Sequence, residues 1–193
     1  MEDPLHSNEI LEIRWHGRGG QGAVTAAIAV AKAAVEVGKY ATASPEFGAE
    51  RRGAPVRAYN RVSTKPIRAR TPILEPDIVV VLDSSLPPEM YLEGIKDGGL
   101  LLINTKRSID EVRRILGNPN IKIAVVDATG IALKTLGIPI VNTAMLGAFA
   151  KLVNIADLSV FESIIYDLVP ERFISSNINS IRIAYNSVVV KDE

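Results

Sequence analysis

The sequence contains no cysteine. This absence excludes disulfide bonds, thiolate-bound metal ions, iron–sulfur clusters held by this chain and a cysteine nucleophile. A redox metal centre, if the protein works with one, must therefore be held by another chain.

The sequence also lacks an excess of either charge, because 22 lysines and arginines balance 22 aspartates and glutamates. Without a net positive field we expect no nucleic-acid partner. No run approaches the roughly 20 apolar residues of a membrane span, and the acidic N-terminus MEDPLHSNEILEIRW does not resemble a signal peptide. We therefore expect no membrane partner and a cytoplasmic protein.

The length of 193 residues and the 47% hydrophobic content suit one domain with a sizeable core. We find no internal repeat and no interdomain linker, so we expect a single domain over residues 1–193.

The first third of the chain predicts a mixed sheet. Residues 10–15 predict a strand, and the alanine-rich segment 23–37 predicts a nearly buried helix. Segments 40–44 and 55–62 predict two strands around a loop at 45–53. Because no helix separates these two strands, the sheet cannot be purely parallel.

The rest of the chain alternates strands and helices. The apolar runs at 78–83, 99–104 and 121–128 are typical of strands buried on both faces. Helical segments are expected at 129–136, 142–154 and 158–169, and Ile178, Ile181, Tyr185 and Val188 fall on one face of a last helix. This order predicts an α/β protein, a single three-layer α/β/α domain that is Rossmann-like with a mixed, mostly parallel sheet.

The stretch WHGRGGQG at residues 15–22 carries four glycines and the only glutamine of the chain. Gly17, Gly19 and Gly22 match the spacing G-x-G-x-x-G between a predicted strand and a predicted helix. Glycines let main-chain N–H groups approach a ligand, and the helix N-terminus favours a phosphate or carboxylate. The alternative is a glycine turn that serves only close helix–strand packing.

Two features argue against a nicotinamide dehydrogenase. Such enzymes place a carboxylate near the end of the second strand, whereas here Glu46 follows only after Pro45. In addition, residues 51–70 hold six arginines, one lysine and no acid. Guanidinium groups suit phosphates and carboxylates on a ligand or on another protein, so we expect this cluster to form an interface, and we assign the arginines of 51–57 first to contact with another subunit.

Polar residues follow three further predicted boundaries, at 83–85, 104–106 and 142–143. Ligands of α/β sheets bind at this edge, although each group is equally suited to cap a helix. His16 is a possible acid–base group, but a lone histidine beside a buried strand is more often structural. We find no nucleophile–base pair, and we assign no catalytic residue and no metal ligand.

The segments HGRGGQG at 16–22, FGAERRGAPVRAYNRVS at 47–63 and DIVVVLDSSL at 77–86 resemble the gamma subunits of 2-oxoacid:ferredoxin oxidoreductases, most closely the pyruvate type. The resemblance extends over essentially the whole chain. It implies a multisubunit enzyme that oxidatively decarboxylates a 2-oxoacid, reduces ferredoxin and forms an acyl-coenzyme A. Indolepyruvate, 2-oxoglutarate and branched-chain 2-oxoacid enzymes use related subunits and remain alternatives.

The resemblance also implies which components lie elsewhere. Thiamine diphosphate with its magnesium ion and the iron–sulfur clusters are expected on the partner alpha, beta and delta subunits, and ferredoxin is the electron acceptor of the complex. Coenzyme A is the co-substrate associated with the gamma-type domain. A purely structural assembly subunit and a free-standing nucleotide-dependent oxidoreductase are the rival interpretations. The residues assigned to coenzyme A are Gly17, Arg18, Gly19, Gly20, Gln21, Gly22, Asn104, Lys106 and Asn142.

Overall fold

The computed structural model describes residues 10–46 and 53–191. Seven strands form one sheet in the order β2-β3-β1-β4-β5-β6-β7. The strands are β1 (Leu11–Arg18), β2 (Tyr40–Pro45), β3 (Pro55–Ser63), β4 (Ile78–Val81), β5 (Leu100–Asn104), β6 (Lys122–Val126) and β7 (Val189–Lys191).

The sheet is mixed and mostly parallel, as the sequence predicts. β1, β4, β5 and β6 pair in parallel, while β3 runs antiparallel to both β1 and β2, and β7 runs antiparallel to β6. Five of the seven strands therefore point the same way. After β1 the chain moves to one side of this strand for β2 and β3, and then crosses to the other side for β4.

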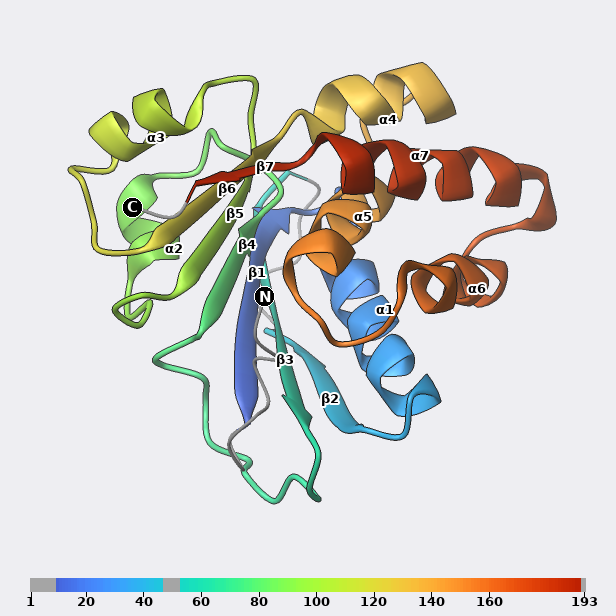
Figure 1. The fold of residues 1–193 in the computed structure, drawn as a ribbon, viewed down its shortest axis with the longest axis horizontal. Helices are drawn as coiled ribbons and strands as arrows, with labels where there is room; N and C mark the ends of the chain where they lie inside the picture. Colours follow the sequence, from blue (N-terminus) through green and yellow to red (C-terminus); the bar gives the residue numbers. More distant parts are fainter. Residues whose placement is uncertain (1–9, 47–52, 192–193) are drawn as a thin grey trace.

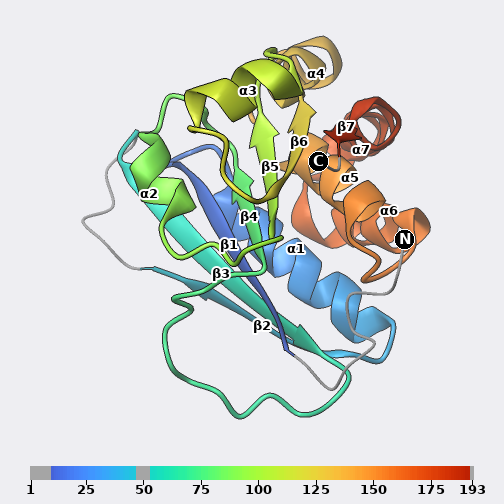
Figure 2. The same ribbon diagram turned by 60° about the vertical axis from the view of Figure 1, so that its left-hand side comes forward.

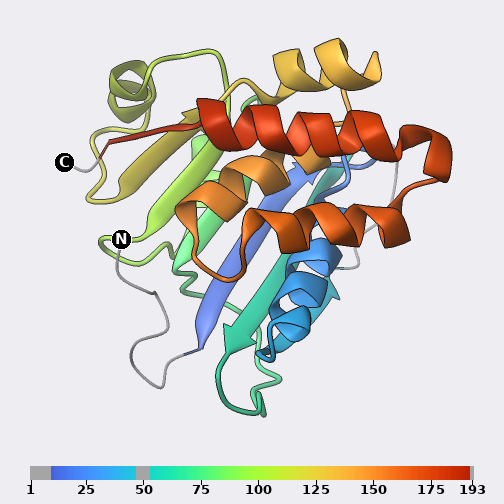
Figure 3. The ribbon, with the colours of Figure 1, turned by 45° about the vertical axis from the view of Figure 1, so that its right-hand side comes forward.

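Helices cover both faces of the sheet and give the predicted three layers. Figure 3 shows α1, α5, α6 and α7 in front of the sheet, and Figure 2 shows α2 and α3 on its other face. The helices are α1 (Ala23–Glu36), α2 (Pro88–Leu92), α3 (Ile109–Ile115), α4 (Ala128–Leu136), α5 (Asn142–Leu152), α6 (Leu158–Leu168) and α7 (Ile174–Ser187), with a 3₁₀ turn η1 (Glu171–Phe173) before α7.

The central strands are apolar on both sides because both sides are covered. In β4, Val80 packs into the cluster beneath α1 and α5, while Val79 and Val81 pack into the cluster beneath α2 and α3. This explains why the sequence of β4 is an unbroken apolar run rather than an alternating one.

Trp15 and Asn60 tie the antiparallel side of the sheet to α1. The Trp15 ring is fully buried, lies 5.4 Å from the Phe149 ring, and donates from Nε1 to Asn60 Oδ1 at 2.9 Å. Asn60 in turn donates to the carbonyl oxygens of Ala27 and Thr42. One buried amide thus links β1, β3, β2 and α1, and its polar atoms are satisfied.

The structure corrects several expected boundaries. β1 continues through Gly17 to Arg18 because its ladder with β3 continues to Pro55, so the expected loop starts later. The sequence interpretation missed α2 and α3, and it extended the last helix to Val188, which precedes the short strand β7. For α3 a signal was present, because Ser108 and Glu111 form a capping box.

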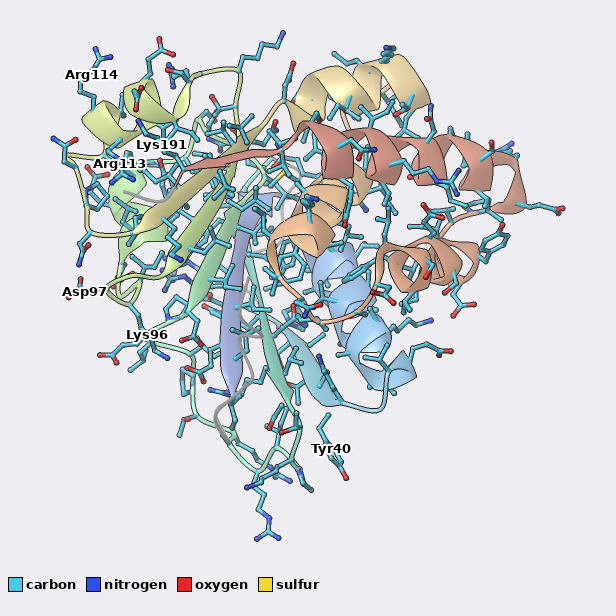
Figure 4. The ribbon with its side chains drawn as sticks, viewed as in Figure 1. Tyr40, Lys96, Asp97, Arg113, Arg114 and Lys191 are labelled. Carbon is cyan, nitrogen blue, oxygen red and sulfur yellow. The ribbon has the colours of Figure 1, made fainter. Side chains whose placement is uncertain are left out.

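The two edges of the sheet carry polar or charged side chains. Figure 4 shows Lys191 on β7 and Tyr40 on β2 at opposite ends of the sheet. Lys191 Nζ donates to Asp110 Oδ1 of α3 at 3.1 Å. Charges of this kind discourage pairing of an open edge with another strand. Across residues 10–46 and 53–191, no helix has the length and apolar character that crossing a membrane requires.

Candidate functional site

The glycine loop lies where β1 ends and α1 begins, at the upper edge of the sheet in Figure 1. Gly20 and Gly22 adopt left-handed backbone conformations with φ of 96° and 85°, which glycine alone adopts without strain. Among the described residues, no side chain caps the first turn of α1 and no acidic residue lies in it. The first N–H groups of α1 therefore have no side-chain acceptor among the described residues, and no acidic side chain there offsets the positive end of its dipole.

The N-terminus of α5 meets the N-terminus of α1 at Gly22. A Cβ atom added to Gly22 would lie 2.6 Å from Nδ2 of Asn142, the first residue of α5. Within the described part of the chain, α5 has no acidic residue in its first turn, and its one side-chain bond there is from Thr143 N–H to Asn142 Oδ1 at 2.9 Å. Two positive helix ends therefore converge beside the loop, an arrangement that favours an anion.

Side chains of the loop are fixed by Asp83, which follows β4. Arg18 Nε and Gln21 Nε2 each donate to Asp83 Oδ2 at 3.0 Å, and the backbone N–H of Arg18 donates to Gln21 Oε1 at 2.7 Å. Arg18 also donates to the Gly53 carbonyl oxygen and to Ser85 Oγ. The sequence predicts that Arg18 and Gln21 contact the ligand, and the structure shows in addition that both side chains hold the shape of the loop.

Asp83 stays ionised in this setting. Burial on its own would raise the pKa of Asp83, but hydrogen bonds from Ser85 and Gln21 and the charge of Arg18 outweigh burial, and its pKa lies below the ordinary value. The carboxylate and the Arg18 guanidinium thus form an ion pair near neutral pH.

A cleft of about 640 Å³ opens beside the loop, along the carboxyl ends of β4, β5 and β6. It lies where the strand order reverses about β1, the usual ligand position in open α/β sheets. Gln21, Asn104 and Lys106 line it, as do Asp83 and Asp127. The remaining lining residues are Leu82, Ser84, Thr105, Arg107, Thr129, Pro139 and Val141.

Asn104 and Lys106 differ in how far their polar atoms are engaged. The Asn104 amide is buried and donates to the Leu82 carbonyl oxygen and to Thr129 Oγ1, while its Oδ1 accepts from Thr129 N. It therefore shapes the cleft wall. The Lys106 side chain is 78% exposed and its Nζ lies 4.0 Å from Asp127 Oδ2, so its ammonium group is accessible to a ligand.

Gly17 and Gly19 serve the backbone of the loop. A Cβ on Gly17 would lie 3.2 Å from Gln21 Oε1 and 3.3 Å from Leu82 Cβ, so Gly17 permits close packing. Gly19 N–H donates to the Ala54 carbonyl oxygen, and Gly19 accepts from Gly53 N. These bonds extend the β1–β3 ladder and bring the segment after residue 52 beside the glycine loop.

The arginines of residues 51–70 do not all have the same surroundings. Arg61 is buried and pairs with Glu12 at 2.8 Å, and Arg57 lies 3.9 Å from Glu46 and from Glu93. Both contribute to the fold. Arg68 and Arg70 are exposed and available to a partner, whereas Arg51 and Arg52 lie outside the described residues.

His16 lies away from the cleft and faces α2. It is 1% exposed, its ring meets the Tyr91 ring edge-on at 6.4 Å, and neither ring nitrogen has a hydrogen-bond partner within residues 10–46 and 53–191. Burial, with the charges of Arg14 and Arg57, lowers the pKa of His16 to about 3. His16 is therefore neutral at physiological pH and does not act there as an acid–base group.

The buried His16 should make the protein sensitive to acid. Its pKa is about 3 when folded and 6.5 ordinarily, so only the unfolded chain takes up this proton between those values. Its contribution to stability is thus complete above pH 6.5 and falls by about 1.4 kcal/mol per pH unit below it. Urea unfolding of the chain at pH 7.5 and pH 5.0 should show His16→Leu losing about 2 kcal/mol less than wild type. Equal losses would contradict the buried neutral ring.

No group of three histidine or acidic side chains suited to a metal ion occurs in the part of the chain that the structure describes. From the sequence, residues 83–85 were expected at the ligand-binding edge but Asp83 was not assigned to coenzyme A, and Asp127, Thr129 and Pro139 were not identified. For Asp127 the same signal existed, because it comes directly after the buried strand β6, just as Asp83 follows β4 after Leu82.

Several named proteins are similar to this chain in sequence and fold. The family model "Pyruvate ferredoxin/flavodoxin oxidoreductase" matches residues 12–187. The pyruvate/ketoisovalerate oxidoreductases common subunit gamma of Thermococcus kodakarensis is 50% identical over 94% of this chain and 98% of its own length. Pyruvate synthase subunit PorC of Methanothermobacter marburgensis is 47% identical over 93% of this chain and 98% of its own length.

A solved structure agrees with these relatives. The crystal structure of the pyruvate oxidoreductase subunit PORC of Thermotoga maritima superposes with a TM-score of 0.85 at 42% identity, over 95% of this chain and 99% of the other. The chain belongs to the pyruvate ferredoxin/flavodoxin oxidoreductase family, in which these relatives are subunits of larger oxidoreductases.

Proposed function

We propose that this chain is the gamma subunit of a multisubunit pyruvate:ferredoxin oxidoreductase and that its cleft binds and positions coenzyme A. The family and the relatives support the subunit assignment. The observation that carries the coenzyme A assignment is the convergence of two helix N-termini, those of α1 and α5, beside the glycine loop, neither of which has an acidic residue in its first turn among the described residues. The chain acts in this role as one domain.

The cleft suits the chemistry of coenzyme A. The two helix ends and the backbone of Gly20 and Gly22 favour a diphosphate, and the exposed Lys106 favours a further phosphate. The ribose-binding acid of a dinucleotide site has no counterpart at the end of β2, because Glu46 there accepts a 2.6 Å hydrogen bond from Tyr59. A nicotinamide dinucleotide is therefore the poorer ligand.

The partners follow from the subunit assignment. We infer alpha, beta and delta subunits that carry thiamine diphosphate, magnesium and the iron–sulfur clusters, with ferredoxin as the acceptor. In the reaction, pyruvate loses CO₂, two electrons pass to ferredoxin, and the acetyl group is transferred to the thiol of coenzyme A. This chain binds the nucleotide end of coenzyme A and holds the thiol at high effective concentration near the partner subunits.

Gly22→Ala tests this proposal in the assembled enzyme. The added methyl group would collide with Asn142 and strain a backbone with φ of 85°, separating the two helix ends. We expect the KM for coenzyme A to rise roughly tenfold with the KM for pyruvate unchanged. The matched control is Gly38→Ala, which also has a positive φ, of 77°, but lies after α1, away from the cleft.

Native mass spectrometry of the same variants distinguishes coenzyme A binding from the rival function, a purely structural role in subunit assembly. If Gly22→Ala abolishes subunit association while the remaining complex keeps its affinity for coenzyme A, the loop serves assembly and the coenzyme A proposal is wrong. An unchanged KM in a fully assembled Gly22→Ala enzyme would also overturn it.

A further inference from the structure

Asp83 has an unusual position for a residue beside a phosphate site. Its carboxylate lines the cleft, yet phosphate groups repel a carboxylate. The Asp83 side chain is 18% exposed and accepts hydrogen bonds from Arg18, Gln21 and the backbone N–H of Ser85, the last at 2.9 Å. These bonds occupy both carboxylate oxygens.

The bonds to Asp83 act on the backbone of the glycine loop through Gln21. Gln21 Nε2 donates to Asp83, and Gln21 Oε1 accepts from the backbone N–H of Arg18 at 2.7 Å. The Gln21 side chain thus folds back toward Arg18 at the start of the loop. Gln21 N also donates to the Arg18 carbonyl oxygen at 3.0 Å, which closes the turn.

Arg18 adds a second set of hydrogen bonds to those of Gln21. We call the bonds that Asp83 makes with Gln21 and Arg18 the clamp. Its guanidinium joins Asp83, the Gly53 carbonyl oxygen and Ser85 Oγ, so the loop is fixed to the start of β3 and to the turn after β4. The charge of Arg18 also balances the charge of Asp83. The glycines Gly20 and Gly22 supply no side chain to hold their own backbone, so these side-chain bonds add to the backbone bonds of Gly19 in fixing the loop.

We propose that Asp83 is a positioning residue for coenzyme A: through Gln21 and Arg18 it holds the glycine loop in the conformation that presents the α1 N-terminus to the phosphates. This inference rests on the proposed function of the cleft. It assigns to Asp83 a favourable effect on binding an anion, opposite to the effect of its charge alone.

The positioning effect of Asp83 and the repulsion by its charge change the KM for coenzyme A in opposite directions, so a substitution at Asp83 can distinguish them. Asp83→Asn in the assembled enzyme should raise the KM for coenzyme A roughly tenfold, because the clamp loses its charge-assisted bonds. The kcat at saturating coenzyme A and the KM for pyruvate should not change. The matched variant Asp127→Asn removes a carboxylate from the same cleft and keeps the cap of α4, since asparagine caps helices equally well. It should lower the KM for coenzyme A up to about threefold.

Gln21→Leu provides a second test that changes no charge. It removes both hydrogen bonds of the Gln21 side chain and should raise the KM for coenzyme A in the same direction as Asp83→Asn. The double variant Asp83→Asn, Gln21→Leu should be less impaired than the product of the two single effects, because both remove one clamp. Native mass spectrometry of each variant checks that the complex still assembles.

The possible outcomes are distinct. A lower KM in Asp83→Asn, as in Asp127→Asn, would show that Asp83 acts only as a nearby charge and would overturn the inference. If Gly22→Ala raises the KM but neither Asp83→Asn nor Gln21→Leu does, the inference fails and the function of the cleft stands. If none of the three changes it, the proposed function fails as well.

Discussion

Replacing Gly20 by aspartate should raise the Kd of the assembled enzyme for coenzyme A about 30-fold, or roughly 2 kcal/mol, through repulsion between the new carboxylate and the phosphates. Gly20 lies at the tip of the loop, and a Cβ atom there would meet no atom of the described residues within 4 Å. The fold therefore has room for the side chain. Equilibrium titration with coenzyme A gives the Kd directly.

Gly20→Asn is the control for this substitution. Asparagine has the size of aspartate, and both residues tolerate the positive φ of 96° better than most others do. We expect it to weaken binding only a few-fold, and we expect the gap between the two variants to narrow at high salt. Equal effects of the two substitutions would mean that the loop does not lie against the phosphates.

Gly147→Ala should destabilise the chain by roughly 3 kcal/mol, at the upper end for adding a methyl group to a packed core. A Cβ atom on Gly147 would lie 2.1 Å from the Ile181 carbonyl oxygen and 2.8 Å from Ile181 Cα. These are backbone atoms of α7, so α5 and α7 would have to move apart. Urea unfolding of the purified chain measures the loss.

The control for Gly147→Ala is Gly137→Ala. Gly137 ends α4 with a φ of 72°, and a Cβ there would meet no described atom within 4 Å. Its substitution adds the same atom and costs only backbone strain, about 1 kcal/mol. If the two variants lose the same stability, the close crossing of α5 and α7 is not a constraint on the fold.

The buried centre of the fold was predictable from the sequence. The unbroken apolar runs of β4, β5 and β6 identify strands covered on both faces, and the alanines of α1 identify a helix packed closely on the sheet. Short elements were not predictable in the same way. α2 has five residues and β7 has three, too few for a hydrophobic period to show.

The glycine loop was recognisable because the glycines that shape its backbone lie close together in the sequence. The hydrogen-bond partners and protonation states of the side chains in and beside the loop were not predictable, because they depend on contacts between residues far apart in the sequence. Arg18 was predicted to contact a ligand, and its partner Asp83, 65 positions later, could not be predicted from the sequence. Likewise, the low pKa of His16 depends on the burial of its ring beside Tyr91 of α2, a helix that the sequence interpretation lacked.

The distance in sequence between Arg18 and Asp83 also sets when the site can form during translation. β1 and the glycine loop leave the ribosome first, but the parallel neighbour of β1 and the carboxylate that clamps the loop follow much later. α5, whose N-terminus completes the cleft, packs on α7 near the C-terminus. A nascent chain therefore carries the glycine loop without its support, and the geometry of the cleft becomes a property of the finished polypeptide.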